Sequence, residues 1–195
     1  QQMQSFNYTD SRLMISESTL SRLSLINGVI KTDARFLFET VVHELPGWII
    51  VNPDSPTPIY AEVGDHRSSE TLVVGINPEN ALNEWLINGR TLNTRDSYSA
   101  MIGDSLASRI FDRPLAQNVT LYGKNFGVVG VCLDTFNRGN VVYIPIKTMP
   151  ELVPQSGCNL LFLKINLSNR TEILSEINAV GLSVLELNHI LNEHT

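Results

Sequence analysis

The chain has 195 residues, of which 43% are hydrophobic and 17% are charged, a balance that predicts a folded core and excludes a disordered protein. Its 14 Lys and Arg residues are outnumbered by 20 Asp and Glu residues, so its formal net charge is −6. This deficit excludes a nucleic-acid partner, which would need a basic face to neutralise its phosphates, and it disfavours binding to an anionic membrane surface.

The beginning of the chain predicts alternating strands and helices. A strand is expected over residues 6–16, and residues 20–30 fit a strand or a short helix because their apolar period is ambiguous. Residues 33–45 carry apolar side chains at helical spacing and predict a helix. Pro46-Gly47 ends that helix, since proline cannot continue it and glycine suits the left-handed exit. A buried strand is expected to follow at 48–51.

A polar stretch with several prolines, residues 52–70, separates this part of the chain from the next. Within it we expect a strand at 60–63 and a hairpin tip at 66–69. An uninterrupted apolar run at 71–76 predicts a buried strand directly after it.

The middle of the chain combines short helices with short strands. A helix is expected to begin at Asn77 as its cap and to end at Gly89, with Leu86 on its apolar face. A strand at 99–103 is expected to lead into a second short helix at 104–111. Short apolar runs predict the remaining strands: 119–122, 126–131, 141–146 and 160–165. A three-residue link that begins with glycine joins the first two of these strands and predicts a hairpin.

The chain ends as it begins, with a helix at 171–180 between two strands, the second of them at 183–187. We therefore predict an α+β fold in which an α/β lobe is built from both chain ends, residues 1–70 and 156–195. A β-rich lobe with short helices, residues 71–155, is predicted as an insertion into it.

Nothing in the sequence predicts a metal or cofactor site. The two cysteines, Cys132 and Cys158, lie outside any CxxC pair and cannot form a metal site by themselves. Two interpretations of them stay open: one disulfide in an oxidising compartment, or two buried thiols. No two histidines have the i, i+4 spacing of a helical zinc pair, so we expect solvated surface side chains: His43, His66, His189 and His194.

One motif suggests an enzyme. Gly103-Asp104-Ser105-Leu106 has the letters of the opening of a GDSL-type esterase, in which Ser105 would be the nucleophile. The motif lies in mid-chain, however, and the DxxH of such esterases is echoed near the end only by Glu186 and His189. We expect Ser105 to be an exposed residue in the first helical turn beside a capping Asp104, and a small esterase remains the weakest alternative.

Several segments, in order, resemble the periplasmic core domain of MacB-like ABC permeases, a superfamily that includes FtsX-related and lipoprotein-releasing permeases. Residues 126–131, FGVVGV, are similar to the family's F-x-V-V-G-V, and residues 142–146, VYIPI, to its V-Y-I-P-L. The other similar segments are 45–48, 71–78, 86–92 and 100–107. Together the six segments cover most of residues 45–150, whereas the first 30 residues match less well.

The resemblance implies a domain on the extracytoplasmic face of the membrane, between two transmembrane helices that would flank Gln1 and Thr195. It implies a porter-like α/β lobe at the chain ends, and no catalysis, because ATP is hydrolysed on a separate cytoplasmic subunit. The implied partners are a second copy of the permease, that ATP-binding subunit and an extracytoplasmic protein. The expected function is mechanotransmission, which couples ATP-driven motion to substrate export or to the outside partner.

In this interpretation the motif residues are structural: Gly47, Gly75, Gly89, Arg90, Gly103, Gly130 and Pro145. Gly89 is expected to stop a helix and Arg90 to anchor a loop by ion pairing or backbone contacts. Gly103 fits a tight turn from strand to helix, and Pro145 ends a strand. An alternative of the same class is a substrate- or lipoprotein-binding module of the permease, which an exposed Trp48 or Trp85 would favour.

Overall fold

The computed structural model describes residues 14–80, 86–133 and 136–182. These residues pack as two units, and β1 and β10 each pass from one unit into the other. We call residues 33–161 the barrel unit, and residues 15–32 with 162–182 the terminal unit. Helices and strands are mixed in the chain, which confirms the predicted α+β class.

The first long element of the barrel unit is a strand where a helix was predicted. β1 (Val29–Leu45) is 17 residues long, and its buried Val42 and Glu44 alternate with exposed Val41 and His43. The apolar residues of 33–45 fit helical spacing as well, so the local pattern could not exclude a helix. The strand is decided by its neighbour β4, which pairs antiparallel with β1 over eight consecutive residues.

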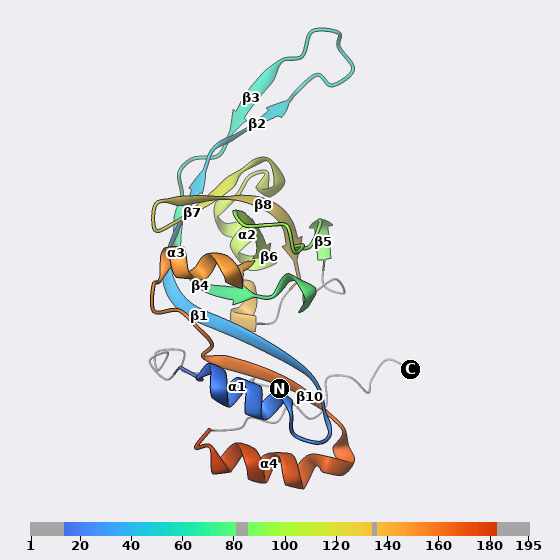
Figure 1. The fold of residues 1–195 in the computed structure, drawn as a ribbon. Helices are drawn as coiled ribbons and strands as arrows, with labels where there is room; N and C mark the ends of the chain where they lie inside the picture. Colours follow the sequence, from blue (N-terminus) through green and yellow to red (C-terminus); the bar gives the residue numbers. More distant parts are fainter. Residues whose placement is uncertain (1–13, 81–85, 134–135, 183–195) are drawn as a thin grey trace. The chain divides into compact units, whose positions relative to one another are not determined.

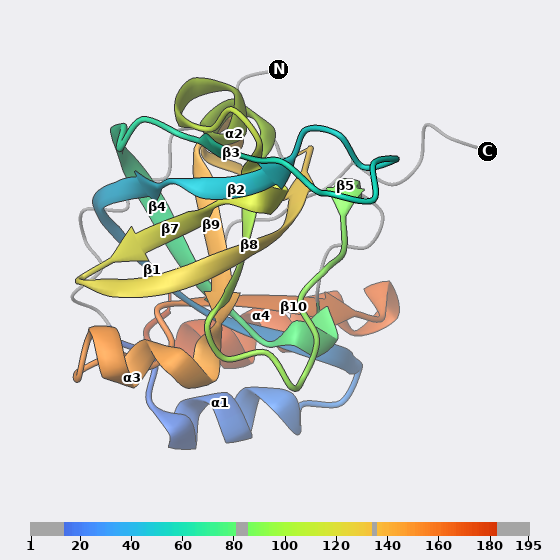
Figure 2. The same cartoon turned by 90° about the horizontal axis from the view of Figure 1, so that it is seen from above.

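Within the described residues, six strands close into a barrel (Figures 1 and 2). Their order around the ring is β1, β4 (Ser68–Ile76), β9 (Val141–Pro145), β6 (Ser99–Gly103), β8 (Lys124–Cys132) and β7 (Asn118–Leu121). β7 pairs with both β8 and β1 and so closes the ring. The pairs β4–β9 and β6–β8 are parallel and the other four are antiparallel. Because the ring is closed, each of the six strands is hydrogen-bonded to a neighbour on both sides. We expect such a barrel to be stiff.

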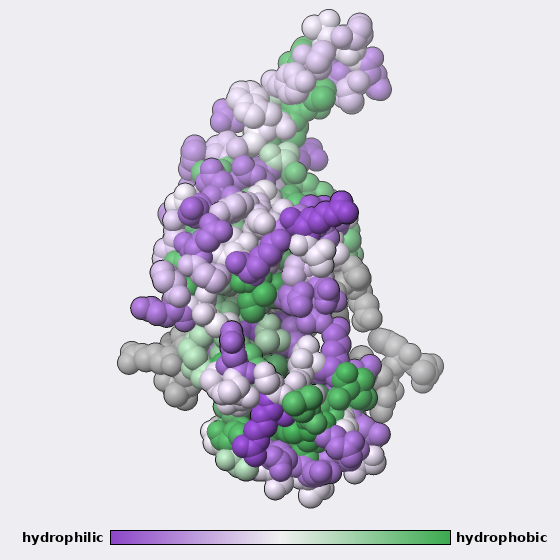
Figure 3. Space-filling view, viewed as in Figure 1, coloured by the Kyte–Doolittle hydropathy of each residue, from purple (hydrophilic) through white to green (hydrophobic). Residues whose placement is uncertain are grey.

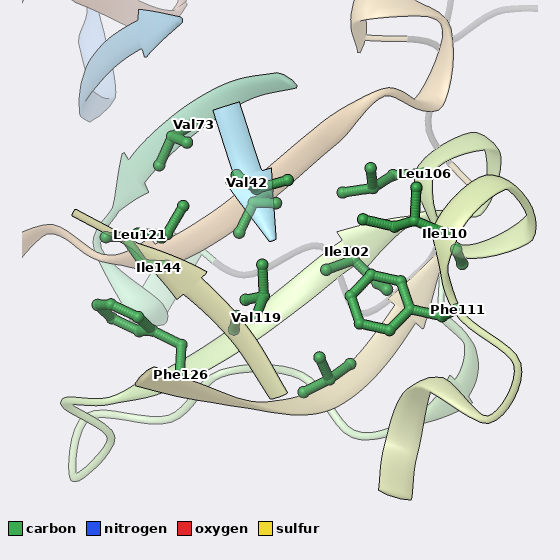
Figure 4. Close-up of a cluster of buried hydrophobic side chains, with 14 of the residues drawn as sticks. Val42, Val73, Ile102, Leu106, Ile110, Phe111, Val119, Leu121, Phe126 and Ile144 are labelled. Atoms are coloured by element: carbon green, nitrogen blue, oxygen red, sulfur yellow. The ribbon is translucent and has the colours of Figure 1, made fainter. Parts of the chain in front are cut away.

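The interior of the barrel is filled by alternate side chains of its strands (Figure 4). The labelled strand residues that point inward are Val42, Val73, Ile102, Val119, Leu121, Phe126 and Ile144. α2 (Asp104–Ile110) adds Leu106 and Ile110 to this core at one end. α3 (Met149–Leu152) adds Met149, which lies against the far end of β4 at Gly75.

The outer faces of the same strands form a second cluster. Leu72, Val74 and Ile76 of β4 point to the side opposite Val73, and Met101 and Tyr143 join them. Leu92, from the segment that follows β5 (Leu86–Gly89), packs over this face. β4 and β9 are thus buried on both sides, which explains why they appear in the sequence as uninterrupted apolar runs.

Glycines allow tight contacts in the barrel unit, and two of them provide a test. A side chain at Gly103 would place its Cβ 2.2 Å from the carbonyl oxygen of Gly139, whereas one at Gly123 would meet open space at φ +74°. We expect Gly103→Ala to lower the free energy of unfolding by about 2–3 kcal/mol, because backbone must move. Gly123→Ala should cost only about 1 kcal/mol, from its left-handed backbone alone. Urea unfolding of both variants measures the difference, and equal losses would contradict the argument.

The terminal unit combines two helices with the ends of two strands. α1 (Glu17–Ser24) begins at Ser16, whose hydroxyl accepts a hydrogen bond from the backbone N–H of Thr19 at 3.2 Å. α4 (Arg170–Ala179) follows β10 (Leu160–Ile165), as predicted, and buries Ile173 and Ile177. Arg22 of α1 and Glu176 of α4 form an ion pair at 3.0 Å, so the two helices contact each other.

Several other predictions need correction. The expected hairpin tip at residues 66–69 is instead the turn into β4, with His66 at φ 54°. Leu86 lies in β5 rather than on a helix, although a 3-10 turn does begin at Pro78 (Pro78–Asn80). The loop of the predicted β7–β8 hairpin is Tyr122-Gly123, both with positive φ, and is therefore shorter than expected. The expected strands at 6–16 and 183–187 lie outside the described residues, apart from the first strand's last residues.

No helix among the described residues is long and apolar enough to cross a membrane.

Candidate functional site

A two-stranded hairpin projects from the barrel unit and exposes apolar side chains (Figures 1 and 3). β2 (Gly47–Ile50) and β3 (Tyr60–Val63) pair antiparallel, and we call residues 47–63 the arm. Residues 48–51 were expected to form a buried strand. They do form a strand at 47–50, but Trp48 is 63% exposed and Ile50 is 46% exposed.

Strand register decides which side chains share a face of the arm. Ile50 lies opposite Tyr60, and Trp48 lies opposite Glu62. These four side chains are all exposed, and Tyr60 is 58% exposed, whereas the intervening Ile49 is half-buried. One face of the arm therefore presents two aromatic rings and a branched aliphatic side chain beside a carboxylate. We call Trp48, Ile50, Tyr60 and Glu62 the open face.

The tip of the arm is held by its own hydrogen bonds. The Asn52 side chain donates from Nδ2 to the carbonyl of Thr57 at 2.9 Å, and its Oδ1 accepts from the backbone N–H of Ile59. The N–H of Val51 donates to the carbonyl of Ile59 at 2.9 Å, which extends the strand pairing to the turn. Three prolines between positions 53 and 58 restrict the backbone further. An isolated two-stranded hairpin is only marginally stable in water, so these restraints are needed to give the arm a defined shape.

The base of the arm is fixed by a buried carboxylate at the end of β1. The side chain of Glu44 is fully buried and accepts hydrogen bonds from the backbone N–H groups of Asp65 at 3.1 Å and Arg67 at 3.0 Å. The Arg67 guanidinium donates to it at 3.3 Å, and the Gln117 side-chain amide donates as well. Arg67 also pairs with Asp112 at 2.8 Å. We call Glu44, Arg67, Asp112 and Gln117 the root clamp.

The root clamp keeps Glu44 ionised. Burial of the carboxylate acts to raise its pKa, but the hydrogen bonds from Arg67, from the N–H of Asp65 and from Gln117 outweigh this and hold the pKa below its ordinary value. Because Glu44 precedes the arm and Asp65 and Arg67 follow it, the clamp ties both ends of the arm to each other and to the barrel.

The arm carries two acidic side chains and no basic one. Between residues 45 and 66 the sequence contains Asp54, Glu62 and Asp65 but no Lys or Arg. Arg67, the nearest cation along the chain, is engaged by Glu44 and Asp112, and these hydrogen bonds raise the pKa of its guanidinium. The apolar open face is therefore set in a negative surround.

The structure brings three of the predicted motif residues together. The N–H of Arg90 donates to the carbonyl of Val129 at 2.8 Å, and a Cβ on Gly130 would lie 2.1 Å from the carbonyl oxygen of Arg90. Gly89, at φ +77°, ends β5 rather than a helix. The Arg90 guanidinium forms an ion pair with Asp96, in the loop that follows, at 2.8 Å.

The other motif residues lie at contacts around the barrel. Gly47 begins β2 after Pro46, not a helix exit, and its Cβ would lie 1.6 Å from the carbonyl oxygen of Ala116. Gly103 makes the predicted turn from β6 into α2, and Pro145 is the last residue of β9, as expected. Gly75 faces the Met149 side chain. These contacts support a structural role for each.

The two cysteines are not joined in the structure. Cys132 and Cys158 are both buried thiols. The Cys132 sulphur lies 3.5 Å from the carbonyl of Ile102, and the Cys158 sulphur lies 3.2 Å from that of Leu160, so each has a separate partner. Of the two interpretations, the disulfide is therefore not formed here. Burial raises the pKa of the Cys158 thiol, which makes it less reactive.

The esterase motif lacks a base among the contacts the structure gives Ser105. Ser105 lies in the first turn of α2, and its hydroxyl accepts from Arg109 at 3.5 Å, a cation that cannot take its proton. Gly103, not Asp104, is the N-cap residue of that helix. Glu186 and His189 lie outside the described residues, as do Trp85 and His194. His43 and His66 are exposed, as expected.

Sequence reasoning missed the arm as a site. The signal was present: apolar residues 48–51, a turn with three prolines, and an apolar pair at 59–60 form a hairpin pattern. Apolar letters alone could not show that Trp48, Ile50 and Tyr60 are exposed. The root clamp gave no signal, because Gln117 is 73 residues from Glu44 in the sequence.

Comparison with known proteins identifies one family, and solved structures of related transporters have a similar fold. The chain matches the family model described as MacB-like periplasmic core domain over residues 4–178. The periplasmic region of MacB from Actinobacillus actinomycetemcomitans has a similar fold, with a TM-score of 0.59 at 18% identity over 86% of this chain and 75% of that one. The extracellular domain of the noncanonical ABC-type transporter YknZ from Gram-positive bacteria gives 0.58 at 14% identity, over 87% and 86%. A search of the curated proteins found no match.

Proposed function

Because the chain belongs to the MacB-like periplasmic core domain family, we propose that it passes ATP-driven motion of a membrane permease to a protein or a cargo outside the cytoplasm. The family places the chain in an ABC transporter permease, and its structural relatives are periplasmic or extracellular domains of such transporters. The match over residues 4–178 is the observation that carries the proposal.

The architecture supports a mechanical role. A barrel whose ring strands pair with neighbours on both sides resists bending, and two packed cores line its two faces. The chain enters and leaves the barrel unit through β1 and β10, which continue into the terminal unit. We propose that transmembrane helices precede Gln1 and follow Thr195.

The proposed assembly contains two copies of the permease and a cytoplasmic ATP-binding subunit. Motion of the membrane helices would then displace the two barrel units relative to each other, while each barrel keeps its shape. The domain itself contributes no catalytic step in this proposal.

Distance measurement by electron paramagnetic resonance in the full-length transporter tests this. Asp54→Cys, at the exposed tip of the arm, carries a spin label, and the native thiols are buried and react poorly. We expect the distance between the labels of the two copies to change by several ångströms between the nucleotide-free and the ATP-bound state. Identical distributions in both states, or no distance between copies, would sink the proposal.

A control pair reports on the barrel alone. Glu39→Cys on β1 and Asn125→Cys on β8 are exposed positions in one barrel unit. In transporters that contain an excess of unlabelled copies, this distance should stay the same with and without ATP. A change there would show that the barrel deforms instead of transmitting motion.

One observation favours a second function, the binding module. Trp48 is exposed, which favours the binding alternative. The coupling and binding functions are compatible, since a domain that moves has an effect only through what it touches.

A further inference from the structure

We propose that the open face of the arm is the docking surface for an extracytoplasmic protein that presents an apolar groove bordered by Lys and Arg side chains. This inference rests on the proposed function, which puts the arm outside the cytoplasm. To the proposed function it adds the surface at which the outside protein docks and the chemistry of that protein.

The open face has the composition of a binding hot spot. Trp48 and Tyr60, the residue types that contribute most to protein interfaces, lie on one side of a ribbon with Ile50 between them. The core of the barrel is filled without them, because its inward side chains come from the ring strands and from α2 and α3. Packing among the described residues therefore does not explain the exposed Trp48, Ile50 and Tyr60.

The arm is also pre-organised. Its tip is restrained by the Asn52 side chain, and its base is restrained by hydrogen bonds to Glu44 from Asp65 and Arg67 on the far side of the arm. A surface that is already ordered loses little conformational entropy when a partner binds. Burying a carboxylate to fix the base of an exposed ribbon is costly for a structure with no use for that ribbon.

Charge selects the kind of partner. Glu62 lies on the open face, and Asp54 and Asp65 flank it at the tip and the base, with no cation between residues 45 and 66. An anionic lipid surface would repel this arrangement, and interfacial segments of proteins are basic instead. A second arm would place acid against acid. A groove with Lys and Arg on its rim complements both the apolar and the acidic components.

Site-specific photo-crosslinking in cells that express the full-length transporter tests the proposal. The photoreactive residue p-benzoylphenylalanine replaces Trp48, and mass spectrometry identifies the attached peptide. We expect a peptide from a different extracytoplasmic protein, with apolar residues near Lys or Arg. A crosslink to a second copy of this chain, a crosslink to lipid, an acidic peptide or no crosslink would each overturn the proposal.

Affinity measurements with the identified protein then use matched variants of the transporter. Trp48→Ala and Tyr60→Ala should each weaken binding about 30-fold or more, as expected for aromatic hot spots. Glu62→Lys should weaken it about 10-fold and reduce its dependence on salt. Ile59→Ala is the control: it removes an equally exposed side chain that alternates to the other face, and it should change the affinity less than about 2-fold. Equal effects of Ile59→Ala and Trp48→Ala would exclude the open face as the binding surface.

Failure of this inference is distinct from failure of the proposed function. If ATP still changes the distance between labels at position 54 while the open-face variants bind normally, the arm is not the docking surface but the coupling role stands. If that distance stays fixed while the variants lose binding, the docking surface stands and the coupling role fails.

Discussion

Replacing Phe126 with alanine is expected to lower the free energy of unfolding by about 3–5 kcal/mol. Phe126 is fully buried inside the barrel, and its ring centroid lies 5.6 Å from that of Tyr98. Its removal leaves a cavity between strands that the closed ring holds in place, so the walls can collapse only in part. Thermal unfolding of the chain should show a melting temperature lower by about 10 °C.

Ile59→Ala is the control for this experiment, since Ile59 is an apolar side chain that is 58% exposed on the arm. Its effect should stay within about 0.5 kcal/mol. If Phe126→Ala were as mild as this control, the barrel interior would not be the core of the unit.

Replacing Glu44 with glutamine is expected to lower the free energy of unfolding by about 2–3 kcal/mol near neutral pH. Glutamine keeps the shape of the side chain but removes the charge that balances Arg67. Its amide NH2 group, a donor, would also face the N–H donors of Asp65 and Arg67 that now bind the carboxylate. Hydrogen exchange of amides in residues 47–63 should become faster, because the base of the arm is released.

Comparison of the wild type with Glu44→Gln also predicts how the stability depends on pH. The hydrogen bonds hold the pKa of Glu44 below its ordinary value of 4.5, so the unfolded chain takes up a proton first as the pH falls. Glu44 therefore contributes its full stabilisation above the ordinary pKa, and this is lost as the pH falls through the lower folded pKa. Denaturant unfolding between pH 3 and 7 should show the wild-type advantage over Glu44→Gln shrinking below about pH 4.5.

Glu39→Gln is the matched control for the acid series, since Glu39 lies on the same strand but is exposed. It should leave both the stability and its pH dependence nearly unchanged. A wild-type curve parallel to that of Glu44→Gln at every pH would contradict an ionised, clamped Glu44.

Elements with a clear apolar pattern could be predicted from sequence. β4 and β9 appear as apolar runs, and α4 shows buried residues at helical spacing, Ile173 and Ile177. The turn residues Tyr122 and Gly123 permitted the β7–β8 hairpin, which was also predicted. The family resemblance rested on the same kind of segment, because most of its motifs lie in the strands of the barrel.

β1 could not be predicted, because residues 33–45 satisfy the helical and the extended period about equally. Their state depends on hydrogen bonds to β4 and β7, whose paired residues all lie 25 or more positions further along the chain. Local propensity is weak against such pairing.

Sequence by itself determined the class of the protein, the strands of the barrel wall other than β1, and the family, because a buried apolar run carries its signal in consecutive residues. The tertiary structure alone decided that β7 closes the ring, that Trp48 and Tyr60 stay uncovered and that Glu44 is buried among Arg67 and Gln117. Closure, exposure and the pairing of a buried charge depend on which distant segments meet, and residues remote in sequence carry no local mark of the contacts they will make.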